Sequence, residues 1–250
     1  MSKSYRPALP HGSIEQIFDD IYMVSGAIQM AKPKMSFSRN MVILRHGESL
    51  TLVNTLRLDE AGLEVLDGLG KVEHVVRLAG FHGRDDPFYA DHYGAKVWVV
   101  KGQFYAKGFD IQKGQPERPY FEPHGELDES SELPWPQASL LRIDGAVPEG
   151  LLHLDRDGGI LISGDTLQNW HRTDEFFSGL AKVMMKLMGF IKPHNVGPGW
   201  LKGAKPSASD VKRILDLEFE HVLPSHGANV LGGAKASFTP SIERALRKLS

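Results

Sequence analysis

Three short stretches of the sequence decide which fold to expect: Phe81-His82-Gly83-Arg84-Asp85-Asp86-Pro87, Ser163-Gly164-Asp165-Thr166-Leu167 and Leu223-Pro224-Ser225-His226-Gly227. Each stretch lies at the end of a predicted strand and offers a histidine or a carboxylate. Loops at strand ends are the usual place for a functional site on a rigid sheet. Because histidine and carboxylate together suit zinc, iron or manganese, the three stretches predict a metal site at one edge of a sheet.

Around these stretches, short apolar and β-branched runs predict most of the strands. The predicted strands are residues 21–25, 40–44, 50–54, 72–78, 96–100, 140–143, 150–154, 159–163 and 222–223. Two of them, 40–44 and 50–54, flank His46-Gly47-Glu48 and are predicted to form a hairpin. Residues 102–136 are rich in glycine, proline and charge, so we expect a loop there with little regular structure.

Helical spacing of apolar residues and capping signals predict the helices. They are residues 59–66 with an acidic cap, 88–93, 180–188, 207–215 with Ser207 and Asp210 as a capping box, and 241–249. Strands, a helix, more strands and then helices predict a mixed α/β (α+β) sandwich rather than a barrel of repeated units. No linker is long or biased enough to divide the chain, so we expect a single domain over residues 1–250.

Composition narrows the class of protein. Of the 250 residues, 41% are hydrophobic and 24% are charged, which is typical of a globular protein. A net charge of -2 gives no basic field for nucleic acid, and the absence of cysteine excludes disulfides and thiolate metal sites. We find neither an apolar leader nor a run long enough to span a membrane, so we expect a cytoplasmic protein with no membrane and no nucleic-acid partner.

The order and separation of the three stretches resemble the metallo-β-lactamase superfamily, over about residues 21–226. The resemblance implies an αββα sandwich and metal-dependent hydrolysis. In that family the first stretch reads His-x-His-x-Asp-His, a further histidine lies before the Gly-Asp-Thr, and the aspartate of Gly-Asp-Thr bridges two metal ions.

This sequence departs from the family pattern at three ligand positions. If His82 takes the first histidine position, then Arg84 and Pro87 stand where two histidines would, and Ala146 stands where the histidine of the later turn would. The surviving candidate metal ligands are His82, Asp86, Asp165 and His226. The resemblance therefore implies an incomplete site that holds one divalent ion (zinc, iron or manganese) or none. We expect Arg84 to pair with Asp85 or Asp86, or else to reach an anionic substrate.

Each candidate also has a purely structural interpretation. His82 alone is more often a hydrogen-bonding loop residue than a ligand, and Asp85-Asp86-Pro87 could simply cap the helix that follows. The Gly-Asp-Thr could be an ordinary turn and the stretch with His226 a strand terminator. The candidate catalytic residues are Asp165 and His171. His171 could be a replacement ligand or general base, although a surface histidine is the more common case.

Residues 176–188 are rich in aromatic residues and methionine. They could shape an apolar pocket, or form an amphipathic helix that packs on the core or on a second subunit, which leaves a homodimer open. Trp200 could be a flat contact over the same site.

The leading hypothesis is a metal-dependent hydrolase-like protein that acts on a small ester, lactone or thioester. The rival hypothesis is a non-catalytic ligand-binding or sensor protein that keeps the fold without the metal chemistry. A third, redox chemistry on iron, finds no flavin or nicotinamide fingerprint in the sequence.

Overall fold

The structure, a computed structural model, describes residues 5–30, 33–105 and 121–249. Its larger sheet has seven strands in the order β1 to β7. The strands are β1 (Glu15–Phe18), β2 (Ile21–Met30), β3 (Met35–His46), β4 (Ser49–Val53), β5 (Lys71–Arg77), β6 (Lys96–Val100) and β7 (Gly125–Leu127). The first four strands pair antiparallel and the later ones pair parallel, with the crossover from β4 to β5 at the centre.

A second sheet has five strands in the order β14-β13-β10-β9-β8. These are β8 (Ala138–Ile143), β9 (Glu149–Leu154), β10 (Ile160–Ser163), β13 (His221–Pro224) and β14 (Val230–Leu231). Within it β10 and β13 run parallel, so Ser163 and Pro224 lie side by side at their carboxyl ends. The sheet therefore delivers the two segments that follow these residues to one edge.

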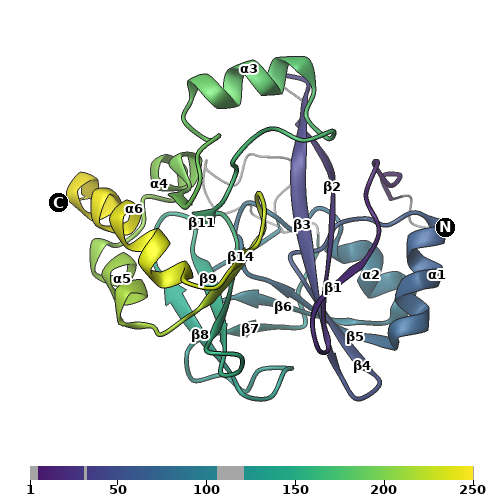
Figure 1. Cartoon of the computed structure of the whole chain (residues 1–250). Coiled ribbons are helices and arrows are strands. Elements are labelled where there is room, and N and C mark those ends of the chain that lie inside the picture. Colours follow the sequence, from purple (N-terminus) through teal and green to yellow (C-terminus); the bar gives the residue numbers. More distant parts are fainter. Residues whose placement is uncertain (1–4, 31–32, 106–120, 250) are drawn as a thin grey trace.

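Helices cover the outer face of each sheet, which gives four layers (Figure 1). The helices α1 (Glu60–Leu69) and α2 (Asp86–Tyr93) lie on the seven-stranded sheet. The helices α4 (Pro198–Ala204), α5 (Ala208–Arg213) and α6 (Ala234–Leu249) lie on the five-stranded sheet, and the short 3-10 helix η2 (Ile214–Asp216) follows α5. The inner faces pack against each other through Val42, Leu44, Leu152, Ile160 and Ile162. The αββα sandwich expected from the sequence is confirmed.

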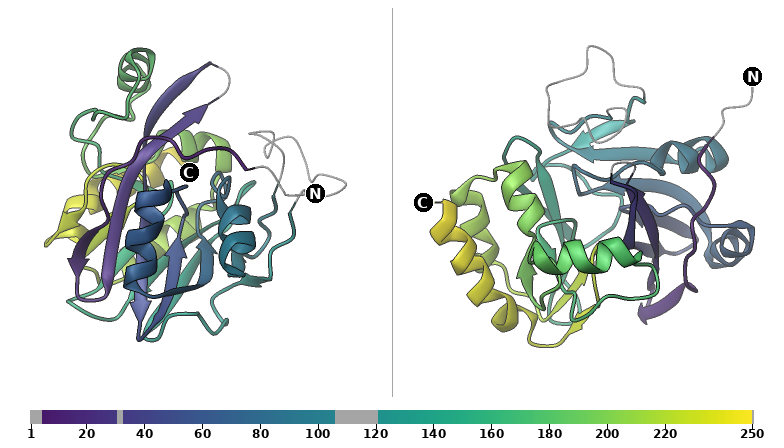
Figure 2. Two further views of the ribbon diagram at one scale, coloured as in Figure 1. Left: turned by 90° about the vertical axis from the view of Figure 1, so that its right-hand side faces the viewer. Right: turned by 90° about the horizontal axis from the view of Figure 1, so that it is seen from above.

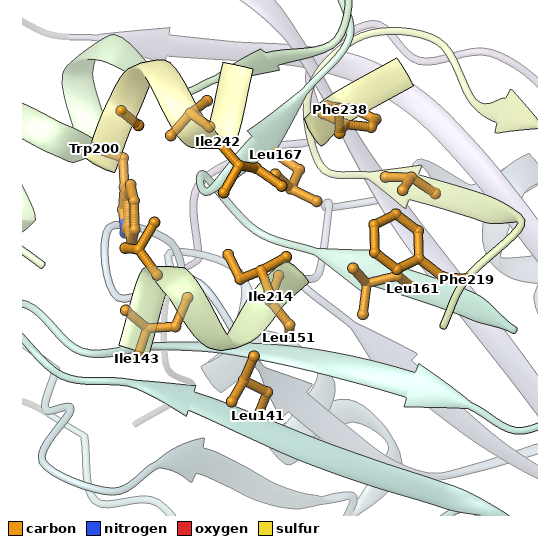
Figure 3. Close-up of a cluster of buried hydrophobic side chains, with 14 of the residues drawn as sticks. Leu141, Ile143, Leu151, Leu161, Leu167, Trp200, Ile214, Phe219, Phe238 and Ile242 are labelled. Atoms are coloured by element: carbon orange, nitrogen blue, oxygen red, sulfur yellow. The ribbon is translucent and has the colours of Figure 1, made fainter. Parts of the chain in front are cut away.

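Alternation along the strands explains this layering. In β3, Met41 and Ile43 face the helix-covered core while Val42 and Leu44 face the other sheet. The core under α4, α5 and α6 includes Trp200, which is 2% exposed (Figure 3). The suggestion that Trp200 is a flat contact over the site is therefore wrong, because its ring is part of the interior.

Two elements differ from the sequence expectation. The last helix begins at Ala234, not at Ser241, and runs through Pro240. Proline costs a helix one hydrogen bond, but the burial of Phe238, Ile242 and Ala245 on one face holds this helix together across it. The segment expected to be a loop contains the short strand β7, which pairs with β6, while its residues 106–120 lie outside the described part of the chain.

Other local predictions are confirmed. β3 and β4 form the hairpin around Gly47. Asp59 caps α1 by accepting from Gly62 N, and Ser207 caps α5 by accepting from Asp210 N.

The helix α3 (Gly179–Leu187) stands apart from these four layers (Figures 1 and 2). It lies on an excursion whose two ends are joined by the small sheet of β11 (Leu167–Gln168) and β12 (Asn195–Val196). In Figure 2 it lies beside the tip of the β2–β3 hairpin. No helix among the described residues is long and apolar enough to cross a membrane.

The carboxyl ends of β5 and β13 are connected by one buried side chain. Asn54, at φ 55 just after β4, accepts hydrogen bonds from Leu78 N and Ala79 N and donates to Ser225 Oγ at 2.8 Å. Gly164 completes the junction because a Cβ there would lie 2.5 Å from the Cβ of Ala79. Segments from both sheets are thereby fixed against each other at one edge.

We expect Asn54→Ala to lower the free energy of unfolding by about 2–4 kcal/mol, because two buried backbone N–H groups lose their acceptor. Urea denaturation measures the change. Asn195→Ala, which removes an exposed hydrogen bond to Gly189 O, is the matched control and should cost less than about 1 kcal/mol. Equal losses in the two variants would show that Asn54 does not hold the sheets together.

Candidate metal centre

The structure brings His82, Asp165 and His226 together from three separate strand ends. His82 follows β5, Asp165 follows β10 and His226 follows β13. The Nε2 atoms of the two histidines are 3.3 Å apart, and Asp165 places one carboxylate oxygen 3.0 Å from His226 Nε2 and the other 3.4 Å from His82 Nε2. These three residues are a group whose ligand atoms all lie within 4.8 Å of one another.

His226 is held in place by its backbone and by its other ring nitrogen. Its Nδ1 is 3.0 Å from Ser38 O, which can only accept, so Nδ1 carries a proton and the ring turns Nε2 toward the group. The Asn40 side chain donates to Pro224 O and Gly227 O on either side of His226. A fixed ring with a backbone acceptor on the far nitrogen is the usual arrangement of a metal-binding histidine.

Burial sets the charges in the group. The side chains of His82 and His226 are 5% and 4% exposed, and that of Asp165 is 13% exposed. Burial lowers the pKa of His82 to about 4, although Asp165 opposes the shift, so this ring is neutral at pH 7. Burial alone would raise the pKa of Asp165, but His82 and His226 outweigh it and the net shift is downward. The group therefore presents a neutral His82 ring and an ionised Asp165 carboxylate beside the His226 ring.

The spacing of these atoms fits one tetrahedral metal ion. An ion with bonds of about 2.0–2.1 Å holds its ligand atoms about 3.3 Å apart. The two histidine Nε2 atoms, 3.3 Å apart, match that value. One oxygen of Asp165 lies 3.0 Å from His226 Nε2 and the other lies 3.4 Å from His82 Nε2, so the carboxylate is within reach of the same ion. Atoms that each offer an electron pair repel one another at this range unless a positive charge, either a proton or a metal ion, lies between them.

Asp86 is the one expected ligand that the structure does not bring to the group. It is fully buried at the start of α2, where it accepts a hydrogen bond from the Thr55 hydroxyl and another, at 2.5 Å, from Tyr105. Burial raises its pKa, although both hydroxyls oppose the shift. The proximity of Asp86 to His82 in the sequence suggested a ligand, but its carboxylate already has two donors of its own.

Arg84, Pro87 and Ala146, which stand where the family pattern has histidines, have structural roles or partners of their own. Arg84 Nε and Nη2 donate to the two oxygens of Asp85, each at 2.8 Å, which confirms the expected ion pair. Ala146 lies in an exposed turn where its N–H donates to Ala204 O. Pro87 lies in the first turn of α2, as expected for a proline near a helix start.

His171 lies outside the group. It is exposed, and its ring centroid is 5.8 Å from that of His194. The structure thus places it on the surface, the alternative that the sequence favoured, and Asp165 is the only expected catalytic residue in the group.

Sequence reasoning missed two charged residues beside the group. Glu149, 1% exposed, accepts hydrogen bonds from Thr166 N and its hydroxyl, and burial together with Asp165 raises its pKa to about 8. Arg39, 3% exposed, pairs with Asp85 at 3.2 Å and lies near enough to Asp165 to interact with its charge. Both residues lie in strands whose other residues are mostly apolar or uncharged. A charged residue in such a strand is uncommon, and this could have marked Glu149 and Arg39 as candidates from the sequence.

The aromatic residues of the methionine-rich segment serve the interior. Phe177 and Met185 are buried with Trp170 and Met35. The Trp170 ring centroid is 5.0 Å from that of His226, and the Phe37 ring is 6.0 Å from it. Apolar rings therefore form one side of the histidine and aspartate group.

With this arrangement the protein has the metallo-β-lactamase fold, and comparison with solved structures bears this out. The DIM-1 metallo-β-lactamase is 14% identical, with a TM-score of 0.62 over 96% of this chain and 99% of that one. The metallo-β-lactamase from Hirschia baltica is 13% identical, with a TM-score of 0.57 over 92% and 98%. FIM-1 from Pseudomonas aeruginosa, in its mono-zinc form, is 15% identical, with a TM-score of 0.56 over 96% and 98%. No protein-family model and no curated protein matches the sequence significantly.

Glu149 makes a pH-dependent contribution to stability that can be measured. The folded chain keeps its proton up to a pKa of about 8, whereas the unfolded chain releases it near 4.5. Between these two pKa values the unfolded state binds fewer protons than the folded state. The stability that Glu149 contributes is therefore fully present at a pH below about 4.5 and is lost as pH rises toward 8. Relative to Glu149→Gln, which cannot ionise, the wild type should lose up to about 1.4 kcal/mol per pH unit between roughly pH 5 and 8.

Urea denaturation in metal-free buffer at a series of pH values measures this difference. His82 is present in both proteins, so its titration cancels. Glu64→Gln, at an exposed position on α1, is the matched control. A difference between wild type and Glu149→Gln that does not change with pH would contradict the assignment of a proton to Glu149.

Proposed function

We propose that this protein is a hydrolase that uses a single divalent metal ion, held by His82, Asp165 and His226, on a small ester, lactone or thioester. The observation that carries the proposal is the convergence of two imidazole nitrogens, 3.3 Å apart, with the two oxygens of the Asp165 carboxylate at 3.0 and 3.4 Å from them in a buried site. Zinc suits this donor set, and iron and manganese are the other ions to test. A mono-zinc form is recorded for FIM-1, which has a similar fold, and that supports a one-ion site here.

One ion is favoured over two because the other carboxylates near the group already have hydrogen-bond or ion-pair partners within the protein. Asp86 and Asp85, the other carboxylates of the first stretch, take their hydrogen bonds from Thr55, Tyr105 and arginines. Arg39, a buried cation, occupies the same region and would repel a second ion.

A metal ion bound here would activate water and polarise the substrate carbonyl. The chain's own contribution is to hold the three ligand side chains in position and to keep the number of negative charges near Asp165 low. Ser38 O fixes the His226 ring, and the buried position of His82 keeps it neutral and able to bind. Glu149 uses Oε1 to accept from Thr166, which leaves Oε2 to hold its proton at pH 7 and keeps a second negative charge away from Asp165.

The substrate class follows from the surroundings of the group. The half-buried ring of Phe37 lies beside His226, so an apolar portion of a substrate is favoured on that side. The net charge of -2 gives no field that would gather a polyanion such as nucleic acid. A small uncharged ester, lactone or thioester fits both observations.

The second candidate is a protein that binds a small ligand without turnover. The low exposure of the group favours it, because Asp165 is the most accessible of the three and only 13% of its side chain is exposed. Arg84 and Ala146 at ligand positions point in the same direction.

Metal binding provides the first test. Protein loaded with zinc and then desalted should retain about one ion per chain by elemental analysis, while Asp165→Asn and His226→Ala should each lose most of it. His171→Ala, on the surface, is the matched control and should bind like the wild type. Retention of zinc by both Asp165→Asn and His226→Ala would overturn the proposed site.

Turnover separates the two candidates. Zinc-loaded protein should hydrolyse at least one substrate in a panel of esters, lactones and thioesters, and a chelator should abolish the activity. His226→Ala should lower kcat/KM by at least about a hundredfold, on the order of 3 kcal/mol of transition-state stabilisation. A ligand that raises the thermal midpoint with no turnover across the panel would favour the binding protein.

A further inference from the structure

The helix α3 presents an apolar face to solvent. Leu180 is 49% exposed, Val183 is 58%, Met184 is 37%, Leu187 is 80%, and Met188, its C-cap, is 55%. Only two other large hydrophobic residues among the described ones are exposed to this degree, Val65 and Leu231, and these lie on different elements. Exposed apolar side chains are ordinary when single, but a contiguous set on one helix marks a contact surface.

This face is not a poorly packed part of the interior, because α3 is attached to the body through a different side. Ala181 and Met185, one turn apart, are buried against Trp170 and Phe177. Ser178 caps the helix, and its N–H donates to Ser36 O on β3. The helix is therefore fixed in an orientation that leaves Leu187 and its neighbours outside.

The charged residues of α3 itself are both lysines. Lys182 and Lys186 are exposed on the same helix, and no aspartate or glutamate occurs between residues 176 and 209. Lys34, just before the start of β3 where Ser36 O accepts from Ser178 N, is also exposed. Asp174 and Glu175 precede the segment, and the Asp174 carboxylate accepts from Phe176 N. The surface thus combines large apolar side chains with a local excess of lysine.

A second copy of the chain is a poor match for this surface. A stable interface between proteins needs about 20–30 residues on each side, burying about 800 Å² per partner. The helix α3 has nine residues and stands apart from the four layers, so it offers a small ridge rather than a broad face.

We propose that α3 docks this protein onto the surface of an anionic lipid bilayer. A helix lying in the bilayer interface needs apolar side chains that enter the acyl boundary and basic side chains that meet the headgroups, and it needs no segment long enough to span. Leu180, Val183, Leu187 and Met188 supply the first, and Lys182 and Lys186 supply the second. This inference does not rest on the proposed hydrolase activity.

Co-sedimentation of the full chain with vesicles tests the proposal. Vesicles that contain phosphatidylglycerol as well as phosphatidylcholine should carry the protein down, and vesicles of phosphatidylcholine alone should carry much less. Lys182→Glu with Lys186→Glu should weaken partition by about thirtyfold or more, at about 1 kcal/mol per lysine lost near the surface. Leu187→Ser with Met188→Ser should weaken it by about tenfold, through lost apolar burial.

The matched control is Val65→Ser, which removes an exposed apolar side chain from α1 and should leave partition unchanged. Thermal midpoints of all variants, expected to stay close to the wild type, show that each is folded. Raised salt should weaken binding because it screens the lysines. Equal sedimentation with both kinds of vesicle, or partition that the α3 variants do not change, would overturn the proposal. A dimer in sedimentation velocity that Leu187→Ser with Met188→Ser converts to monomer would also overturn it, in favour of a second copy.

Discussion

The side chain of Asn54 links the parts of this fold that have to coincide for a site to exist. It satisfies two backbone N–H groups where β5 ends and donates to Ser225, the residue before His226. Ser225 in turn donates to Ser163 O, two residues before Asp165. One amide and one hydroxyl thus tie three strand ends from two sheets into a single network. Because these polar groups are buried, each of them would carry a desolvation penalty if its hydrogen bond were not made.

The electrostatics around this junction divide into two halves. In one half, the rings of His82 and His226 converge with the Asp165 carboxylate, and the His82 ring is neutral. In the other half the chain supplies its own counter-charges, since Arg39 and Arg84 both pair with Asp85. Arginines and hydroxyls of the protein therefore take up the charge of the second half, so the two halves need different partners to become neutral.

The sequence predicted the architecture well because strand alternation and helix caps are local signals. Asp59 and Ser207 began their helices as expected, and the three strand-end stretches met at one edge. The role of Asp86 could not be read in the same way, because it depends on Thr55 and Tyr105, which are distant in the chain. The same holds for Glu149, whose environment is set by Asp165 and Thr166 across the sheet. The order of residues along the chain showed which residues lie near the site. Only the folded structure distinguished candidate metal ligands from residues whose hydrogen bonds are already made within the protein.

The separation of His82, Asp165 and His226 along the chain also bears on how the protein folds. Each follows a different strand, and β10 pairs in parallel with β13, which lies far along the sequence. Such long-range pairing closes large loops and is slow to form. No partly folded chain that lacks either sheet can present all three side chains, so an ion captured by this group would bind only the finished fold. Supply of that ion would then act on the lifetime of the whole protein, because it shifts the equilibrium between the native chain and every species exposed to proteolysis.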